Sequence, residues 1–420
     1  MTLLNEETYQ NDRISDLPGN VIDVILGNLK IRDQIRTSIL STKWRYMWTS
    51  APQLCFDQDL FEIFQHLDDP NTVISKIITD LLMGHNGPIH KFTLFIPYNS
   101  YFKITMEHLN MWIPILSRKD IKYLDLVNDY GQVYQMPYIV LSCKELTYFK
   151  VGGFKLSIPP NFYGFKRLLE LHLVCVRFES GALENLMSGC PFLEKLNIEL
   201  CDGFEYLDIS STTLKVLLLQ LSDDMKSICL KKAKNLIDFT LDANHNSLSD
   251  SIKSLPKLKR FSLVRGKKNP YAESIPPTLL TSSFSSLEYL QLDDLNLNDK
   301  EDIVFFVSVL KSAPGLIEVV IKSHNDNDTS QVLDLSKELE CRSCCLKFQT
   351  VDIYVRANPQ YAMSLIQFIL ANSPSLKILT FNCNSKKLNA RTLYRISQDL
   401  LWMKRTSPRA HVKFLLSTFP

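Results

Sequence analysis

Three cysteines near the end of the chain form the densest cluster of side chains that could bind a metal ion. Cys341, Cys344 and Cys345 include one Cys-x-x-Cys pair, a spacing that many zinc sites use. A structural zinc site takes four ligands, yet the nearest histidine, His324, stands seventeen residues upstream and no second Cys-x-x-Cys pair exists. The other cysteines stand in apolar surroundings, typical of buried thiols in a reducing compartment. We therefore expect neither a metal site nor a cofactor.

Motifs of the common catalytic sites are absent from the sequence. It has no Gly-x-Ser-x-Gly turn, no phosphate-binding Gly-rich loop ending in Gly-Lys-Ser/Thr, and no His-Glu-x-x-His helix. The segment from Asp326 is rich in possible calcium ligands, but its sixth and twelfth positions are Gln331 and Lys337. An EF-hand loop needs Gly and Glu there. We therefore expect that the protein is not an enzyme.

Basic residues gather in two clusters, either of which could hold an anion. The two clusters are Lys226, Lys231, Lys232 and Lys234, and Lys253, Lys257, Lys259, Arg260, Arg265, Lys267 and Lys268. We interpret both as solvated loop surfaces and keep an anion site as the alternative. The net charge of the 420 residues is only +2, so electrostatics favours neither nucleic acid nor an anionic membrane as a partner.

The first fifty or so residues predict a small helical module. Apolar residues recur at helical spacing from Val21 to Leu29 and make one wide apolar face. Asp33 is expected to cap a second helix and Ser41 a third, which contains Trp44. A segment this short cannot bury enough surface to be stable alone. Its large apolar side chains must therefore contact the rest of the chain or a partner protein.

A phrase of the form apolar-x-x-apolar-x-apolar recurs from residue 89 onward. Its twelve instances begin at Ile89, Ile121, Leu146, Leu168, Leu193, Leu214, Leu236, Leu258, Leu287, Leu316, Phe348 and Leu376. From Ile121 on, successive instances start 21 to 32 residues apart, the period of leucine-rich repeats, in which each unit is one strand and a return segment. The fold class predicted is α/β, a solenoid of parallel strands with helical or irregular returns. Nearly all of the leucines are expected to pack in its core.

Prolines mark the ends of several return segments. Pro191, Pro256, Pro314 and Pro374 each stand two residues before the first apolar residue of a phrase. Proline ends a helix and biases its neighbour toward extended backbone. The segments before Pro191, Pro314 and Pro374 have helical periodicity, so a cycle of strand, helix and proline is expected. Before the first phrase, residues 72–83 predict an amphipathic helix that rests against the first repeat.

Residues 12–50 resemble the F-box, a helical module that docks onto a Skp-family adaptor. The resemblance is carried by Leu17-Pro18, Ile25-Leu26, Leu29, Arg32-Asp33, Thr37-Ser38, Leu40-Ser41, Lys43-Trp44-Arg45 and Met47-Trp48. The phrases resemble leucine-rich repeats, and the C-terminal segment resembles the FBD domain. The FBD resemblance is carried by Leu400-Leu401, Arg405, Ser407-Pro408-Arg409 and residues 412–415.

Taken together, the chain resembles the plant F-box/FBD/LRR-repeat family. The resemblance implies an F-box at 12–50, a helical linker at 51–88, a leucine-rich-repeat solenoid at 89–344, and an FBD domain and C-terminal cap at 345–420. It also implies which side chains meet the adaptor. The expected adaptor-binding residues are Leu17, Pro18, Ile25, Leu26 and Leu29. We expect Val21, Ile35, Ile39 and Trp44 to lie in the module's own core.

Side chains that alternate with the buried ones along each strand are expected on the concave face of the solenoid. They mix both charge signs with apolar residues, which suits a protein partner better than a phosphate backbone. The candidate target-binding residues are His172, Lys195, Asn197, Glu199, Leu218, Asp238, Arg260, Tyr289, Gln291 and Lys322.

The function implied is that of the substrate-recognition subunit of an SCF-type E3 ubiquitin ligase. Its partners would be a Skp-family adaptor, through it a cullin, and a target protein, with no nucleic acid and no membrane. A scaffold or decoy without ligase output and a ligand-dependent sensor are the alternatives that the sequence leaves open. The N-terminus is polar and acidic, unlike a signal peptide, so an intracellular protein of nucleus or cytoplasm is expected.

Overall fold

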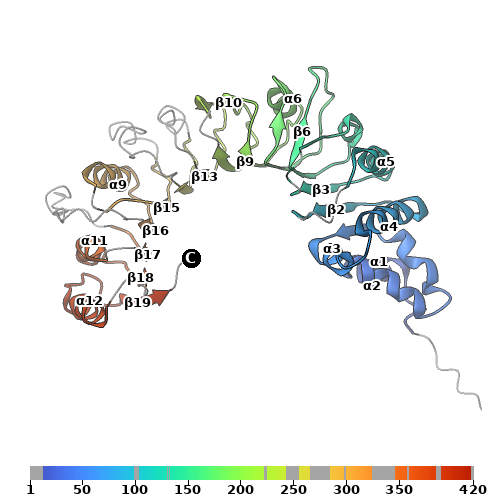
Figure 1. Cartoon of the computed structure of the whole chain (residues 1–420). Helices are drawn as coiled ribbons and strands as arrows, with labels where there is room; N and C mark the ends of the chain where they lie inside the picture. The colour runs from blue at the N-terminus through green and yellow to red at the C-terminus, as the bar shows by residue number, and fades with distance from the viewer. Residues whose placement is uncertain are drawn as a thin grey trace, which may run out of the picture. The chain divides into compact units, whose positions relative to one another are not determined.

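The computed structural model describes most of the chain (Figure 1). The described residues are 13–98, 104–129, 131, 133–221, 225–242, 255–264, 284–297, 299–323, 346–356, 359–384 and 389–417. They fall into two compact units, Met1–Pro191 and Phe192–Pro420. Each unit is described by itself below.

The first unit begins with four short helices, which we call the helical module (residues 13–51). They are α1 (Gly19–Gly27), α2 (Ile31–Arg36) and two 3-10 helices, η1 (Thr37–Ile39) and η2 (Trp44–Ser50). Asp33 lies inside α2, whose N-cap is Lys30, so the expected Asp33 cap is wrong. Ser41 Oγ does accept a hydrogen bond from the Trp44 N–H at 3.3 Å. The third predicted helix is therefore present, as the 3-10 helix η2.

The rest of the first unit is a parallel sheet with helices between its strands. The strands, in spatial order, are β1 (Gln53–Phe56), β2 (Lys91–Ile96), β3 (Tyr123–Asn128), β5 (Tyr148–Gly152) and β7 (Glu170–Val174). The helices are α3 (Gln58–Phe64), α4 (Pro70–Gly84), α5 (Met106–Ser117), η3 (Tyr138–Ser142) and α6 (Ala182–Ser188). A second, three-stranded sheet forms within the returns from β4 (Tyr134–Gln135), β6 (Phe154–Leu156) and β8 (Arg177–Phe178).

The helix expected at residues 72–83 is α4, and it packs against α5 through a Trp112 Nε1–H bond to Thr79 Oγ1 at 3.0 Å. Strand β1 was not expected. It lies inside the segment interpreted as a helical linker, yet it pairs with β2 in parallel register, so the sheet begins at residue 53. A strand of four residues without the repeat phrase leaves too little pattern to be recognised in the sequence.

Two buried polar side chains fasten the helical module to this sheet. The Gln34 side-chain amide donates to the carbonyl oxygens of Leu26, Leu29 and Gln53, at 2.8, 3.1 and 3.2 Å. The ring nitrogens of His85 lie 2.8 Å from the Ala51 carbonyl oxygen and 3.0 Å from that of Gly87. Since Gln34 belongs to α2, Gln53 to β1 and His85 follows α4, these bonds join the module to the first strand and to the helix beside it.

Nine strands form a parallel sheet in the described residues of the second unit. In spatial order these are β9 (Lys195–Cys201), β11 (Val216–Leu221), β13 (Asp238–Asp242), β14 (Arg260–Val264), β15 (Tyr289–Asp293), β16 (Glu318–Ser323), β17 (Thr350–Val355), β18 (Ile378–Asn384) and β19 (His411–Ser417). Three helices, α9 (Lys300–Ser312), α11 (Gln360–Asn372) and α12 (Ala390–Trp402), lie on one side of its later strands (Figure 1). Strands β10 (Tyr206–Asp208) and β12 (Ser227–Cys229) pair in the returns.

The repeat prediction is confirmed, because a strand begins two residues after the start of each of the twelve phrases. Helices α6, α9 and α11 end two or three residues before Pro191, Pro314 and Pro374. Among the described residues, no helix is both long and apolar enough to cross a membrane.

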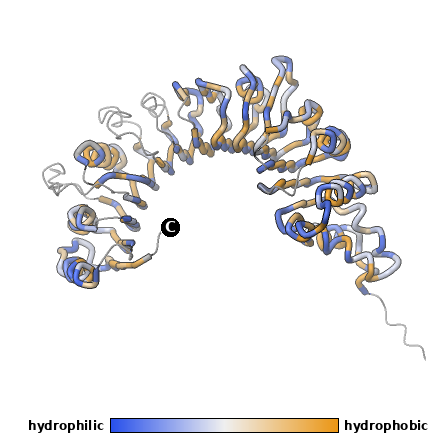
Figure 2. The backbone as a smooth tube through the Cα atoms, viewed as in Figure 1, coloured by the Kyte–Doolittle hydropathy of each residue, from blue (hydrophilic) through white to orange (hydrophobic). Residues whose placement is uncertain are grey.

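Burial alternates along the strands, and Figure 2 shows the same alternation in hydropathy. One side of each strand points into a core in which leucine, isoleucine and phenylalanine are below 2% exposed at most positions. The side chains between them are half-buried or exposed and form what we call the open face of each sheet. The open face is where the candidate target-binding residues were expected.

Candidate functional site

The helical module closes a small core of its own. Ile22, Leu26, Trp44 and Ala51 are 5% exposed or less and contact one another. Ile22 and Leu26 are four residues apart on α1, so they point in the same direction, toward the indole of Trp44. The assignment of Trp44 to the core agrees with this burial.

The five expected adaptor-binding residues divide into three groups. Pro18 is exposed, and Leu17, Ile25 and Leu29 are half-buried at the border of the core. Leu26 is 0% exposed and belongs to the core, which corrects its assignment to the adaptor surface. Periodicity alone could not decide this, since α1 is apolar on more than one side and only the packing of Trp44 selects the inward side.

Apolar side chains also lie on the outside of the module. Ile39 is 84% exposed, Val24 64%, Leu40 55% and Ile14 53%. Val21 is 37% exposed, so the assignments of Val21 and Ile39 to the core are both wrong. These side chains have no core to enter, because the small core is already filled by its own residues.

All ten candidate target-binding residues lie on the open face, and none is buried. His172 belongs to the first unit and the other nine to the second. Strand register sets their neighbours. Lys195, Val216 and Asp238 stand side by side on β9, β11 and β13, and Asn197 stands beside Leu218. Within its own strand, the Asn197 side-chain amide donates to the Glu199 carboxylate.

A charged and aromatic group occupies the middle of the second unit's open face. The Arg260 guanidinium lies 3.7 Å from the centre of the Tyr289 ring, and its Nε is 3.5 Å from the Asp238 carboxylate. Burial raises the pKa of the Asp238 carboxyl above its usual range, although the Arg260 charge opposes that shift. Arg260 on β14 therefore contacts side chains of both neighbouring strands, β13 and β15, and its remaining N–H groups can meet a partner.

The next positions on these strands continue the polar group. Tyr289 Oη donates to Gln291 Oε1 at 2.7 Å, and Gln291 Nε2 donates to the Asp293 carboxylate at 3.0 Å. Lys322 Nζ is 2.9 Å from the same carboxylate. Asp238, Arg260, Tyr289, Gln291 and Lys322 were selected separately from the sequence, and the fold brings them into one hydrogen-bonded and ion-paired group through Asp293.

The first unit's open face carries an aromatic ladder that the sequence analysis missed. The rings of Tyr123 and Tyr148 are stacked, with centroids 3.9 Å apart, and His172 lies 5.0 Å beyond Tyr148. Lys91 Nζ lies 4.7 Å from the Tyr123 ring centre. The signal was available, because the phrases at Ile121 and Leu146 both carry tyrosine at their third position and the phrases lie in register.

Titratable groups beside this ladder are shifted by burial. The pKa of Asp125 is raised because burial penalises its charged form, against the opposing charges of Lys150, His172 and Lys91. Burial likewise lowers the pKa of His172, although Glu170, whose carboxylate is 3.7 Å from Nε2, opposes the shift. The ladder therefore presents ring edges and a partly desolvated carboxyl, which suit hydrogen-bonded contact with a protein surface.

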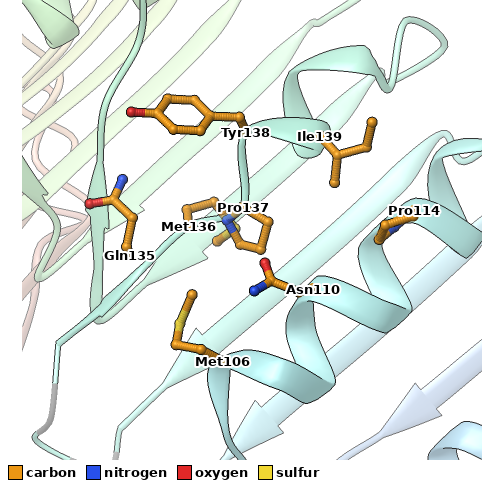
Figure 3. Close-up of a pocket in the computed structure, with 8 residues that line it drawn as sticks. All are labelled: Met106, Asn110, Pro114, Gln135, Met136, Pro137, Tyr138 and Ile139. Carbon is orange, nitrogen blue, oxygen red and sulfur yellow. The ribbon is translucent and has the colours of Figure 1, made fainter.

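A pocket of about 450 Å³ opens between α5 and the segment from β4 to η3 (Figure 3). Its walls are formed by Met106, Asn110, Pro114, Gln135, Met136, Pro137, Tyr138 and Ile139. In Figure 3, Met106 and Asn110 rise from α5 toward Met136 and Pro137. The Tyr138 hydroxyl is engaged with Ser157 Oγ at 3.1 Å. The lining offers neither an acid-base pair nor a nucleophile, so it supports no catalytic chemistry.

The described ranges contain no group of three or more His, Cys, Asp or Glu placed to hold a metal ion. Burial raises the pKa of Cys143, Cys190 and Cys383 to about 12, which keeps these thiols protonated and unreactive. The cluster of Cys341, Cys344 and Cys345 lies outside the described residues, as does the segment that begins at Asp326.

Several of the clustered basic residues are paired with neighbours across strands or returns. Lys226 is paired with Glu205, Lys259 with Glu288, and Arg260 with Asp238. Lys253, Arg265, Lys267 and Lys268 lie outside the described residues. The paired residues belong to mixed-charge surfaces, as expected of solvated faces.

Several known proteins are similar to this chain over most of its length. The family model "FBD-associated F-box protein At5g56370, LRR repeats" matches residues 109–321, just over half of the chain, and the F-box domain model matches residues 14–56. The chain is 28% identical over 420 residues to the F-box/FBD/LRR-repeat protein At1g13570 of Arabidopsis thaliana, covering 96% of this chain and 98% of that protein. It is 26% identical over 418 residues to another F-box/FBD/LRR-repeat protein of Arabidopsis thaliana, At1g78750. That alignment covers 88% of this chain and 89% of the relative. Among solved structures, an internalin from Listeria monocytogenes aligns with a TM-score of 0.40 and 14% identity, covering 84% of this chain and 92% of that one.

Proposed function

Because the chain belongs to the FBD-associated F-box proteins with leucine-rich repeats, we propose that it is the substrate-recognition subunit of an SCF-type E3 ubiquitin ligase. The F-box module binds a Skp-family adaptor and, through it, a cullin. The open face of the repeats binds a target protein, and the chain itself carries out no chemistry. Its place of action would be the cytoplasm or the nucleus.

The observation that carries the proposal is the apolar surface outside a closed core. Ile39, Leu40 and Val24 are all more than half exposed, while Ile22, Leu26 and Trp44 already fill the inside. Exposing such side chains to water is unfavourable by roughly 25 cal/mol per Å² of apolar surface. Docking against an apolar groove of a partner removes that cost. Together with Pro18, Leu17, Ile25 and Leu29, these residues form the proposed adaptor surface.

The mechanism proposed is proximity. A lysine of the bound target meets the ubiquitin-carrying enzyme at a high effective concentration, provided that the protein holds the two in a fixed geometry. The hydrogen bond of Gln34 to Gln53 and that of His85 to Ala51 support such a geometry within the first unit. A module free to swing would dilute the effect.

The open face supports a protein target rather than a nucleic acid. Its cations Arg260 and Lys322 are engaged with Asp238 and Asp293, which compete with a phosphate for them, and Leu218 adds an apolar contact. Interfaces between proteins combine aromatic and arginine side chains in this way. Tyr289 and Arg260, stacked on each other, are the side chains we expect to contribute most to target binding.

The adaptor surface is tested by Ile39→Asp, with Ile63→Asp on α3 as the matched control because Ile63 is also exposed, at 45%. We expect Ile39→Asp to weaken binding of a purified Skp-family adaptor by about 2 kcal/mol or more, roughly thirtyfold, in a calorimetric titration. Ile63→Asp should leave the affinity unchanged. Equal affinities for the parent and Ile39→Asp would contradict the proposed surface.

Ligase output separates this function from that of a scaffold or decoy. Co-purification with adaptor and cullin, followed by a ubiquitination assay on proteins captured by the open face, should give modified targets. Capture without any transfer of ubiquitin in the complete complex would favour the scaffold.

A further inference from the structure

In the part of the chain that the structure describes, β19, the last strand of the second unit, has a strand neighbour on one edge only. Its seven residues pair in parallel with β18, and among the described residues no strand pairs with its other edge. The His411 N–H donates to the Lys377 carbonyl oxygen at 2.8 Å, so the backbone groups of His411 face β18. Backbone direction alternates along a strand. Val412, Phe414 and Leu416 therefore direct their N–H and C=O groups to the free edge.

The same three residues also lack apolar cover. Their register partners on β18 are Leu379, Phe381 and Cys383, which are 1% exposed or less. Val412 and Phe414 are only half-buried, and Leu416 is 49% exposed, although the Phe414 ring stacks on Phe381 at 5.6 Å. Each repeat is normally covered by the next one. One further strand is what this edge lacks.

We propose that this strand is β19 of a second copy, paired antiparallel across a twofold axis. A register centred on Phe414 places Phe414 opposite its own copy and Val412 opposite Leu416. The outward backbone groups of all three residues are then satisfied, and the apolar row continues from one copy into the other. On the open face, Lys413 stands opposite Leu415.

Other registers of the same pair are less favourable. Side chains alternate between the two faces of a strand. Only registers that keep the core-facing residues of both copies on the same face of the joined sheet therefore need comparison. A centre at Lys413 sets the two lysines directly opposite each other, and like charges in that position are destabilising. A centre at Leu415 leaves Val412 without a partner in either strand. Of these three centres, Phe414 gives the best-matched symmetric arrangement.

The edge carries few of the features that block such pairing. Protected edges use prolines, bulges or several charges. Strand β19 has no proline and a single lysine, and its register with β18 is unbroken over all seven residues. A twofold axis perpendicular to the sheet also keeps α12 of both copies on the same side. On that helix Leu401 and Trp402 are 68% and 85% exposed.

Sedimentation equilibrium of the purified chain tests the pairing. We expect a reversible dimer whose dissociation constant rises about tenfold or more in Leu416→Lys, because the new cation must be buried opposite Val412. Leu169→Lys in the first unit is the matched control, since Leu169 is 42% exposed. A parent chain that stays monomeric at every concentration, or a dimer that Leu416→Lys leaves unchanged, would overturn the proposal.

The register is tested by cysteine cross-linking. Directly opposite residues of a hydrogen-bonded antiparallel pair have Cα atoms about 5.5 Å apart, within the range of a disulfide. Phe414→Cys should therefore give a 414–414 linked peptide on mild oxidation, identified by mass spectrometry against the parent as background. Val412→Cys should not link to itself, but should link to Leu416→Cys in a mixture. Equal self-linking of Val412→Cys and Phe414→Cys would exclude this register.

Discussion

Trp44 fixes which side chains of the helical module face inward. Its indole is 1% exposed and closes the core formed with Ile22, Leu26 and Ala51. This is why two of the apolar residues assigned to the core from the sequence, Val21 and Ile39, remain outside. Which apolar residues of the module are buried depends on how they pack around Trp44, and neither composition nor periodicity predicts that packing.

Replacing Trp44 by alanine should reduce the free energy of unfolding by about 3–5 kcal/mol, since a large buried ring is lost and a cavity remains. Urea unfolding followed by circular dichroism measures the change. Tyr46→Ala is the control, because Tyr46 is 67% exposed, and it should have little effect. Equal stabilities of the two variants would show that Trp44 is not part of the core.

His85 makes the stability of the first unit depend on pH. Burial lowers its pKa below the ordinary value of 6.5, with the backbone carbonyls of Ala51 and Gly87 opposing the shift. A lowered folded pKa means that the unfolded chain binds the proton more readily. The contribution of neutral His85 to the free energy of unfolding is therefore complete above about pH 6.5. It is lost as the pH falls through the pKa that His85 has in the folded chain.

We expect the free energy of unfolding to fall more steeply between pH 7.5 and pH 5 in the parent chain than in His85→Gln, whose side chain does not titrate. All other titrating groups are shared, so the difference in slope belongs to His85. Parallel pH profiles would contradict the assignment.

At the scale of elements, the strands of the repeats could be predicted because their phrase is local. Each strand needs only two inward apolar residues and a preceding turn, and the prolines before several strands mark where helices end. The features that escaped prediction depend on distant contacts. Strand β1 exists because β2 offers it a partner, and the sheet of β4, β6 and β8 forms because successive returns stack.

The features of the open face also divide into those that the sequence predicted and those that it did not. Alternation along each strand was enough to put Arg260, Tyr289 and Lys322 on the open face. Their connection through Asp293, and the stacking of Tyr123 on Tyr148, depend on the register between strands that are far apart in the sequence. Register follows from the whole fold and not from one phrase.

The turn after β5 depends on a glycine. Gly153 has a φ of +71°, and a Cβ there would lie 1.9 Å from the Asn128 carbonyl oxygen. Gly153→Ala should cost roughly 2–5 kcal/mol of stability, combining a left-handed conformation with a backbone clash. Gly181 has a similar φ of +75° but open space around it, so Gly181→Ala should cost only about 1 kcal/mol. Thermal unfolding of both variants tests this, and equal losses would be inconsistent with the tight turn.

For the whole molecule, the proposed function requires two surfaces that act independently. Leu218→Asp combined with Tyr289→Ala should reduce target capture by about thirtyfold, as loss of central contacts does, without changing adaptor affinity. Ile39→Asp should do the reverse. Proximity labelling in plant cells under proteasome inhibition measures both effects. Proteins that the open-face variant loses and the Ile39→Asp variant keeps are the targets, and identical labelled sets would argue against the open face as the target site.

The central claim is that residues 13–51 form a surface completed by an adaptor while the open face stays free for another protein. Hydrogen–deuterium exchange of the full chain, with and without a purified Skp-family adaptor, tests it most directly. We predict slower exchange confined to the helical module and the segments next to it, with the strands of the second unit unchanged. Unchanged exchange throughout the module at saturating adaptor, or protection centred on the open face, would contradict the claim.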